Sequence, residues 1–154
     1  MLDQDLNGLA DFIRSMRPAQ AGCMAVSGCV SAESIALPSP IKIETLIQST
    51  SAWDATPYRR YPDGQPLISV LSITVAPHAA LDWHSHPMPN AAYVLAGELI
   101  VERKDGIRRR FVAGQALIET VDRIHRGVTG EIPVVLIVFY AGAPGLRLSQ
   151  AASS

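Results

Sequence analysis

Short segments of strand-forming residues, separated by turn signals, fill the sequence from Ile41 to Ala141. The clearest are Leu67–Val75, which is followed by a proline, and Pro133–Ala141, which is almost continuously apolar. Asp105-Gly106 is the strongest hairpin signal, and we expect both residues to adopt positive φ in a two-residue turn. Many short strands with almost no helix predict an all-β sandwich or a barrel closed on itself.

Ile41–Ile47 alternates between apolar and polar residues, as is typical when one face of a sheet packs on a core. The other expected strands are Leu81–His86, Ala91–Leu95, Glu98–Arg103, Ile107–Val112 and Ala116–Glu119. Pro133–Ala141 differs because both of its faces are apolar, so we expect it at the centre of a sheet.

The composition argues against several functions. The chain has 154 residues, with 13 basic and 14 acidic side chains, and the basic run Arg108–Arg110 is flanked by acidic residues, so no nucleic-acid surface is expected. No segment approaches the roughly 18 consecutive apolar residues of a membrane span. The two cysteines, Cys23 and Cys29, imply neither a disulfide framework nor a Cys-x-x-Cys metal site.

Residues 1–40 are expected to form a helix and a linker ahead of the barrel. Apolar residues at spacings of three and four predict an amphipathic helix over Leu2–Met16, which together with the linker packs on the barrel or on a partner subunit. The alternative is a degenerate export segment, because Val26–Cys29 has the form of a lipoprotein processing site. Acidic residues precede it, so we expect a cytoplasmic location, with periplasmic or lipid-anchored export as the alternative.

Two histidines, His84 and His86, lie two residues apart in one expected strand, where such side chains point to the same side. A third, His125, follows an apolar run and a turn. Neutral imidazoles suit late first-row divalent ions. The sequence therefore predicts a three-histidine metal site inside the barrel, for iron, nickel, zinc, copper or manganese.

The spacing around these histidines resembles the two motifs of the cupin family of small jelly-roll barrels, and in particular its quercetin-dioxygenase-like members. In the first motif His84, His86 and Gly97 match, while Asn90 stands at the glutamate position and His78 at the leading glycine. In the second motif Gly114 and His125 match, while Thr120, Asp122 and Thr129 stand at the proline, glycine and asparagine positions. The resemblance implies a double-stranded β-helix barrel over residues 41–148, with a short N-terminal helical extension and a disordered tail over 149–154.

The departures from these motifs bear on the site. Because Asn90 is a weak neutral ligand, the resemblance implies three histidines and an additional group. Glu119 ends an apolar run; facing inward it would be a fourth ligand, an orienting partner or a general base, and facing outward a surface residue. Asn90, Met88 and Tyr93 are further candidates for the surrounding cavity. We expect His78 to occupy a left-handed turn and not to bind metal.

Three functions fit these features. The resemblance implies a metal-dependent dioxygenase-type oxidoreductase acting on a small molecule. The second possibility is a non-catalytic module that binds a small ligand or metal, and the third is a metal-free isomerase or epimerase, which fits least because few basic residues fall on inward positions. Fold membership cannot choose among them. We also expect a homodimer that uses the apolar strand Leu67–Val75 and the Ile41 strand.

Overall fold

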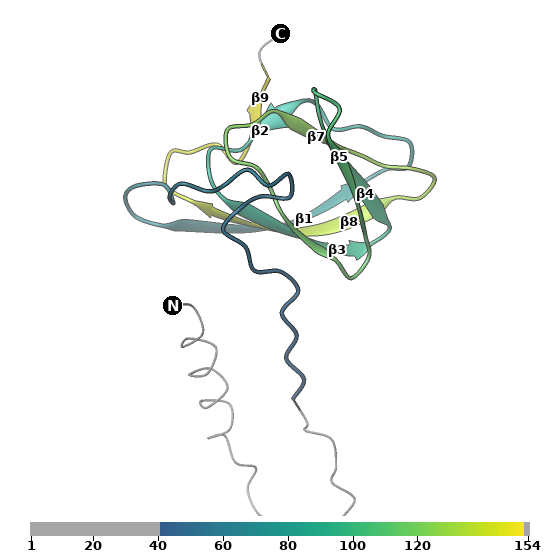
Figure 1. Cartoon of the computed structure of the whole chain (residues 1–154), viewed down its shortest axis with the longest axis horizontal. Coiled ribbons are helices and arrows are strands. Elements are labelled where there is room, and N and C mark those ends of the chain that lie inside the picture. Colours follow the sequence, from purple (N-terminus) through teal and green to yellow (C-terminus); the bar gives the residue numbers. More distant parts are fainter. Residues whose placement is uncertain (1–40, 153–154) are drawn as a thin grey trace, which may run out of the picture. The chain divides into compact units, whose positions relative to one another are not determined.

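The structure, a computed structural model, describes residues 41–152 (Figure 1). The expected helix over Leu2–Met16, its linker and the possible export segment lie outside the described residues. Within residues 41–152 no helix is present. Consequently no helix in this range is long and apolar enough to cross a membrane.

Two antiparallel sheets face each other across a common core (Figure 1). The first contains, in spatial order, β1 (Leu67–Val75), β8 (Val134–Gly142), β3 (Asn90–Ala96) and β6 (Ala116–Ile118). The second contains β5 (Arg108–Val112), β4 (Glu98–Arg103), β7 (His125–Val128), β2 (His84–Ser85) and β9 (Gln150–Ala151). The predicted all-β jelly-roll architecture is confirmed.

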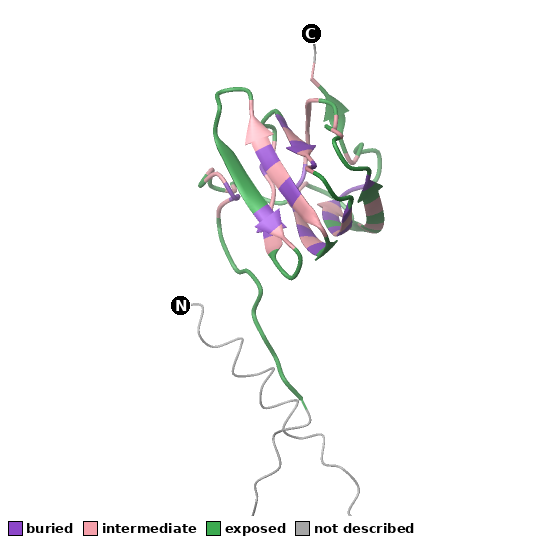
Figure 2. Ribbon diagram, turned by 90° about the vertical axis from the view of Figure 1, so that its right-hand side faces the viewer, coloured by how far each residue is buried: buried purple, intermediate pink, exposed green. Residues whose placement is uncertain are grey.

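Alternating side chains along the strands build the core, seen in Figure 2 as bands of buried and less buried residues. The inward positions of β8 are Val134, Leu136, Val138 and Tyr140, and those of β3 include Ala92 and Val94. β8 lies between β1 and β3, as expected for a strand that is apolar on both faces.

Three predicted features of the strands are wrong in detail. Ile41–Ile47 is extended but belongs to neither sheet, because alternation reports only which faces of a segment are apolar and not whether the segment joins a sheet. The Leu81–His86 strand is reduced to the two residues of β2. In the β4–β5 hairpin only Gly106 has positive φ, at 88°, and its N–H donates to the Arg103 oxygen at 3.1 Å, so the loop has three residues.

The C-terminal segment departs from the expected disordered tail over 149–154. Gln150–Ala151 form β9 beside β2, and the Ala152 N–H donates to the Trp83 oxygen at 2.8 Å. These are main-chain hydrogen bonds to the open edge of β2, so the side-chain pattern carries no sign of them. The C-terminal segment is therefore attached to the strand that carries His84.

Residues at the motif glycine positions keep left-handed backbone conformations even where glycine is absent. His78 has φ of 52° and Asp122 of 55°, which confirms His78 as a turn residue. Gly97, where glycine is retained, has φ of 77°, and a Cβ there would lie 2.1 Å from the Pro133 oxygen. Only glycine fits at that position.

Candidate metal centre

Three histidine side chains meet inside the barrel, as predicted. His84 of β2 and His125 of β7 are direct cross-strand partners, and His86 lies two residues beyond His84. The ring centroids are 4.7 to 5.1 Å apart, and the potential ligand atoms all lie within 4.8 Å of one another. His86 is 3% and His125 1% exposed, while His84 is partly exposed. These three histidines could hold a metal ion.

Each of the three rings is oriented by a main-chain carbonyl that accepts a hydrogen bond from Nδ1. The distances are 2.7 Å for His84 and Asp82, 2.6 Å for His86 and Leu148, and 2.9 Å for His125 and Arg123. Because a carbonyl oxygen only accepts, each Nδ1 carries a proton, and in a neutral ring Nε2 is then left with a lone pair. This tautomer presents Nε2 as the ligand atom, and metal-binding histidines commonly have such outer partners.

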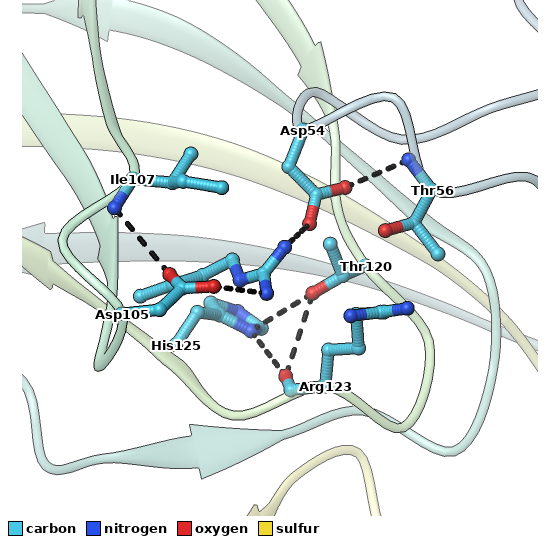
Figure 3. Close-up of polar contacts among 8 residues, drawn as sticks. Asp54, Thr56, Asp105, Ile107, Thr120, Arg123 and His125 are labelled. Atoms are coloured by element: carbon cyan, nitrogen blue, oxygen red, sulfur yellow. Dashed lines mark hydrogen bonds and ion pairs between the residues drawn. The ribbon is translucent and has the colours of Figure 1, made fainter.

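His125 has a second contact at Nδ1. The hydroxyl oxygen of Thr120, which is fully buried, lies 3.2 Å from Nδ1, close to the Arg123 carbonyl that accepts the main hydrogen bond (Figure 3). Thr120 thus helps to orient the ring from the proline position of the second motif.

Glu119 faces the interior, so the outward alternative is wrong. Its Oε2 atom lies 2.8 Å from His86 Nε2 and 3.4 Å from His125 Nε2. Burial alone would raise the pKa of Glu119, but hydrogen bonding and charge from His125 and His86 hold that pKa well below its usual range. Burial alone would lower the pKa of His125, but hydrogen bonding to and charge from the neighbouring Glu119 carboxylate raise it. Glu119 is therefore an ionised carboxylate beside the histidines.

The facing acceptor atoms at this centre favour a bound cation. With each Nδ1 facing a carbonyl, the Nε2 atoms of His86 and His125 both face the Glu119 carboxylate, and His125 Nε2 is buried without a hydrogen bond. Such atoms repel unless a proton or a metal ion compensates them. Adjacent ligand atoms at about 2.1 Å from one ion lie about 3.0 to 3.4 Å apart, close to the 2.8 Å and 3.4 Å that separate Glu119 Oε2 from His86 Nε2 and His125 Nε2. The donor set therefore fits a divalent transition ion.

Asn90 and Tyr140 lie next to this cluster. Asn90, the first residue of β3, is 2% exposed, and neither atom of its amide has a hydrogen-bond partner. Tyr140 is its cross-strand partner on β8, and the Tyr140 ring centroid is 5.7 Å from that of His86. Burial, together with the charge of Glu119, raises the pKa of Tyr140 to about 12, so the phenol keeps its proton. Tyr140 was not predicted, because a continuously apolar strand does not reveal which residues face inward.

The two other predicted cavity residues have different surroundings. Met88 is fully buried and packs in the hydrophobic core. Tyr93 has the opposite orientation in β3 from the buried Ala92 and Val94, and it therefore faces the outer side of the sheet. The sequence of β3 does not reveal which of its faces is the inner one, which led to the error at Tyr93.

Two cavities flank the segment 58–61, which is held in place by a hydrogen bond from the Tyr58 hydroxyl to the Glu119 main-chain oxygen. One, of about 490 Å³, includes Phe139 and Ile118 in its lining, and the other, of about 850 Å³, includes Asp122 and Arg123. No histidine of the metal cluster lines either cavity. The partly exposed His84 therefore marks the side on which the cluster meets solvent.

Neither a protein-family model nor a curated protein matches the sequence. Similar solved structures include the DMSP lyase DddQ of Ruegeria pomeroyi, with a TM-score of 0.50 and 18% identity over 55% of this chain and 43% of that one. The polyketide cyclase RemF of Streptomyces resistomycificus has a TM-score of 0.50 and 21% identity over 60% and 66%. A cupin-like protein of Thermotoga maritima has a TM-score of 0.49 and 17% identity over 56% and 65%.

The chain has the cupin fold. The chain spans less than half the length of the DMSP lyase and just under two thirds of the other two proteins. At such identities the likeness concerns the fold, and many unrelated activities share a fold of this kind. The activity of this protein has to be inferred from its own site.

Proposed function

We propose that this cupin is a metal-dependent enzyme acting on a small organic molecule. In this proposal His84, His86 and His125 bind the metal and Glu119 is the fourth ligand. The supporting observation is that three main-chain carbonyls set the same tautomer in all three rings, and that the Glu119 carboxylate lies 2.8 Å from His86 Nε2 and 3.4 Å from His125 Nε2. Iron, nickel, zinc, copper and manganese are all compatible with such ligands.

The histidines and Glu119 would have different roles in this centre. The histidines fix the position of the ion, and Glu119 supplies the negative charge that Asn90 lacks. A bound divalent ion would polarise a substrate oxygen, and a redox-active one would also allow electron transfer. Three neutral rings and one carboxylate leave a divalent site with a net positive charge, which favours a substrate that binds through oxygen.

Two reaction classes remain for the enzyme. A dioxygenase-type oxidation is the first, and it follows from the motif resemblance. A redox-neutral elimination or cyclisation is the second, because a divalent ion can polarise a substrate oxygen without any change in its oxidation state. Loading the protein with zinc distinguishes the two classes, because zinc has no redox chemistry and could support only the redox-neutral reaction.

The test starts from the full chain, stripped with a chelator and reloaded with either Fe²⁺ or Zn²⁺. We expect one ion per chain, loss of the ion in His125→Ala, and retention in the matched control His78→Ala. Oxygen uptake with diketones, phenols or thiols in the iron form alone would support the dioxygenase, while turnover in the zinc form would support the redox-neutral class. A bound ion without turnover would favour the binding module, and absence of metal binding would contradict the proposal.

We further propose a homodimer built on the open edge of β1. β1 lies at the end of its sheet, and Leu67, Ile68 and Val70 are 49%, 53% and 64% exposed. The extended segment 42–48 carries exposed Ile43 and Leu46 and belongs to neither sheet. A second copy would therefore supply a strand to pair with the open edge of β1 and a sheet edge for this segment. Light scattering should give twice the chain mass, and Val70→Lys should shift it toward the monomer, whereas a monomeric wild type would refute the dimer.

A further inference from the structure

Asn90 is a buried amide that the rest of the barrel does not satisfy. It stands on an inward position of β3, is 2% exposed, and both Nδ2 and Oδ1 lack a hydrogen-bond partner. Buried amides almost always have partners, because leaving them unpaired destabilises the fold. A ligand group that both accepts and donates hydrogen bonds would satisfy this side chain.

The surroundings of Asn90 indicate where that ligand would lie. The β3–β8 register places Tyr140 directly opposite Asn90, and the Glu119 N–H donates to the Asn90 main-chain oxygen at 3.1 Å. Directly opposed residues point to the same face of a sheet. Tyr140, Asn90 and Glu119 therefore form a row on the inner face of the first sheet. The 5.7 Å separation of the Tyr140 and His86 rings places this row beside the histidines.

Within this row the roles of the side chains differ. The Glu119 carboxylate is already directed at His86 and His125. The Tyr140 phenol can donate a hydrogen bond, and the Asn90 amide offers two N–H donors and one acceptor. The row thus presents donors and one vacant acceptor next to the metal centre.

We propose that Asn90 and Tyr140 recognise a small substrate with a hydroxyl group next to a carbonyl or carboxylate, as in an α-hydroxy acid. This proposal rests on the proposed metal centre. The substrate carbonyl or carboxylate oxygen accepts from Asn90 Nδ2 and the Tyr140 hydroxyl, and the substrate hydroxyl donates to Asn90 Oδ1. A simple carboxylate cannot satisfy Oδ1, because it has no donor. The hydroxyl is therefore the group that the site selects.

The probes are lactate and propionate, which differ only in the hydroxyl group. Calorimetric titration of the zinc-loaded full chain should show at least about tenfold tighter binding of lactate. In Asn90→Leu the preference should disappear while the zinc content stays the same. Tyr140→Phe should weaken both probes, and Tyr93→Phe, which changes a tyrosine on the outer face of the sheet, should change neither.

Equal affinity for the two probes, binding of neither, or a preserved preference in Asn90→Leu would overturn the recognition role. If Asn90→Leu does not fold, Asn90→Asp retains the shape and should lose the preference, because the added charge repels the carboxylate of lactate. Zinc content, measured on the same samples, separates the two proposals. Bound zinc without hydroxyl preference overturns recognition alone, and loss of zinc from the wild type overturns both.

Discussion

The Nδ1 atom of His86 lies 2.6 Å from the main-chain oxygen of Leu148, although 62 residues separate them in the sequence. Two residues after Leu148, β9 begins, and it pairs with β2, the strand that carries His84. The last few residues of the described chain therefore orient one histidine ring and support the strand of another. In the proposed metal site, this relationship would make metal affinity depend on a segment that contributes no ligand.

Removal of residues 148–154 should weaken metal binding. The deletion takes away the carbonyl that orients His86 and the strand that covers β2, and loss of such outer partners typically costs roughly 10- to 100-fold in metal affinity. Competition with a chromophoric chelator measures this change. Removal of residues 153–154 alone is the matched control and should have no effect. Equal affinity of the two truncated proteins would refute the orienting role.

Glu119→Gln should lower metal affinity, because it keeps the shape of the side chain but removes the charge beside His86 and His125. We expect a decrease of at least about tenfold, in the range found for groups that support a metal site. The control Glu131→Gln changes a carboxylate whose side chain is 90% exposed. Unchanged affinity with lost turnover would instead assign Glu119 to proton transfer.

The ion pair between Asp54 and Arg103 should stabilise the fold in a pH-dependent way. The Asp54 side chain is fully buried, and its carboxylate lies 2.6 Å from the guanidinium (Figure 3). Asp54→Ala removes one of the two carboxylates paired with the Arg103 guanidinium, which keeps its contact with Asp105, and should cost about 2 kcal/mol in the free energy of unfolding, measured in urea. Glu44→Gln, in an exposed pair with Lys42, should cost less than about 1 kcal/mol.

The pH dependence has a definite sign. Burial alone would raise the pKa of Asp54, but hydrogen bonds from Thr56 and the pairing with Arg103 lower it. The stabilisation is therefore complete above the unfolded pKa of about 4 and is lost as the pH falls through the folded pKa. Urea titrations at pH 7 and pH 3 should show a smaller acid-induced loss in Asp54→Asn than in the wild type. An equal loss would mean that other carboxylates dominate.

His78 should tolerate glycine but not a β-branched residue. Its φ of 52° lies in the left-handed region, which valine strongly disfavours. We expect His78→Val to cost about 1 to 2 kcal/mol and His78→Gly to be neutral or stabilising, by thermal or urea unfolding. Metal content should stay the same in both variants. A loss of metal in His78→Gly would mean that the turn position had been misjudged.

The histidines could be predicted from sequence because strand geometry and spacing act together. His84 and His86 share a face wherever a strand forms, and His125 follows at the distance of one motif. Glu119 was recognisable as a charge within an apolar run. Tyr140 was not, because the sequence around it has no alternation from which to infer direction.

Other features have no trace in side chains. β9 and the Leu148 carbonyl act through the main chain, which every residue possesses. Ile41–Ile47 shows the reverse problem: its alternation is clear, yet the segment belongs to neither sheet of the described chain. Pattern predicts which residues avoid water more reliably than it predicts what they contact.

All three imidazoles take their tautomer from peptide carbonyls and none from a side-chain acid. No single substitution removes a main-chain carbonyl. A point mutation at Asp82, Arg123 or Leu148 therefore leaves in place the hydrogen-bond acceptor that orients the histidine ring. If the proposed centre is catalytic, a change of substrate in an engineered variant would accordingly arise most easily at Asn90 and Tyr140, without disturbing the three histidines.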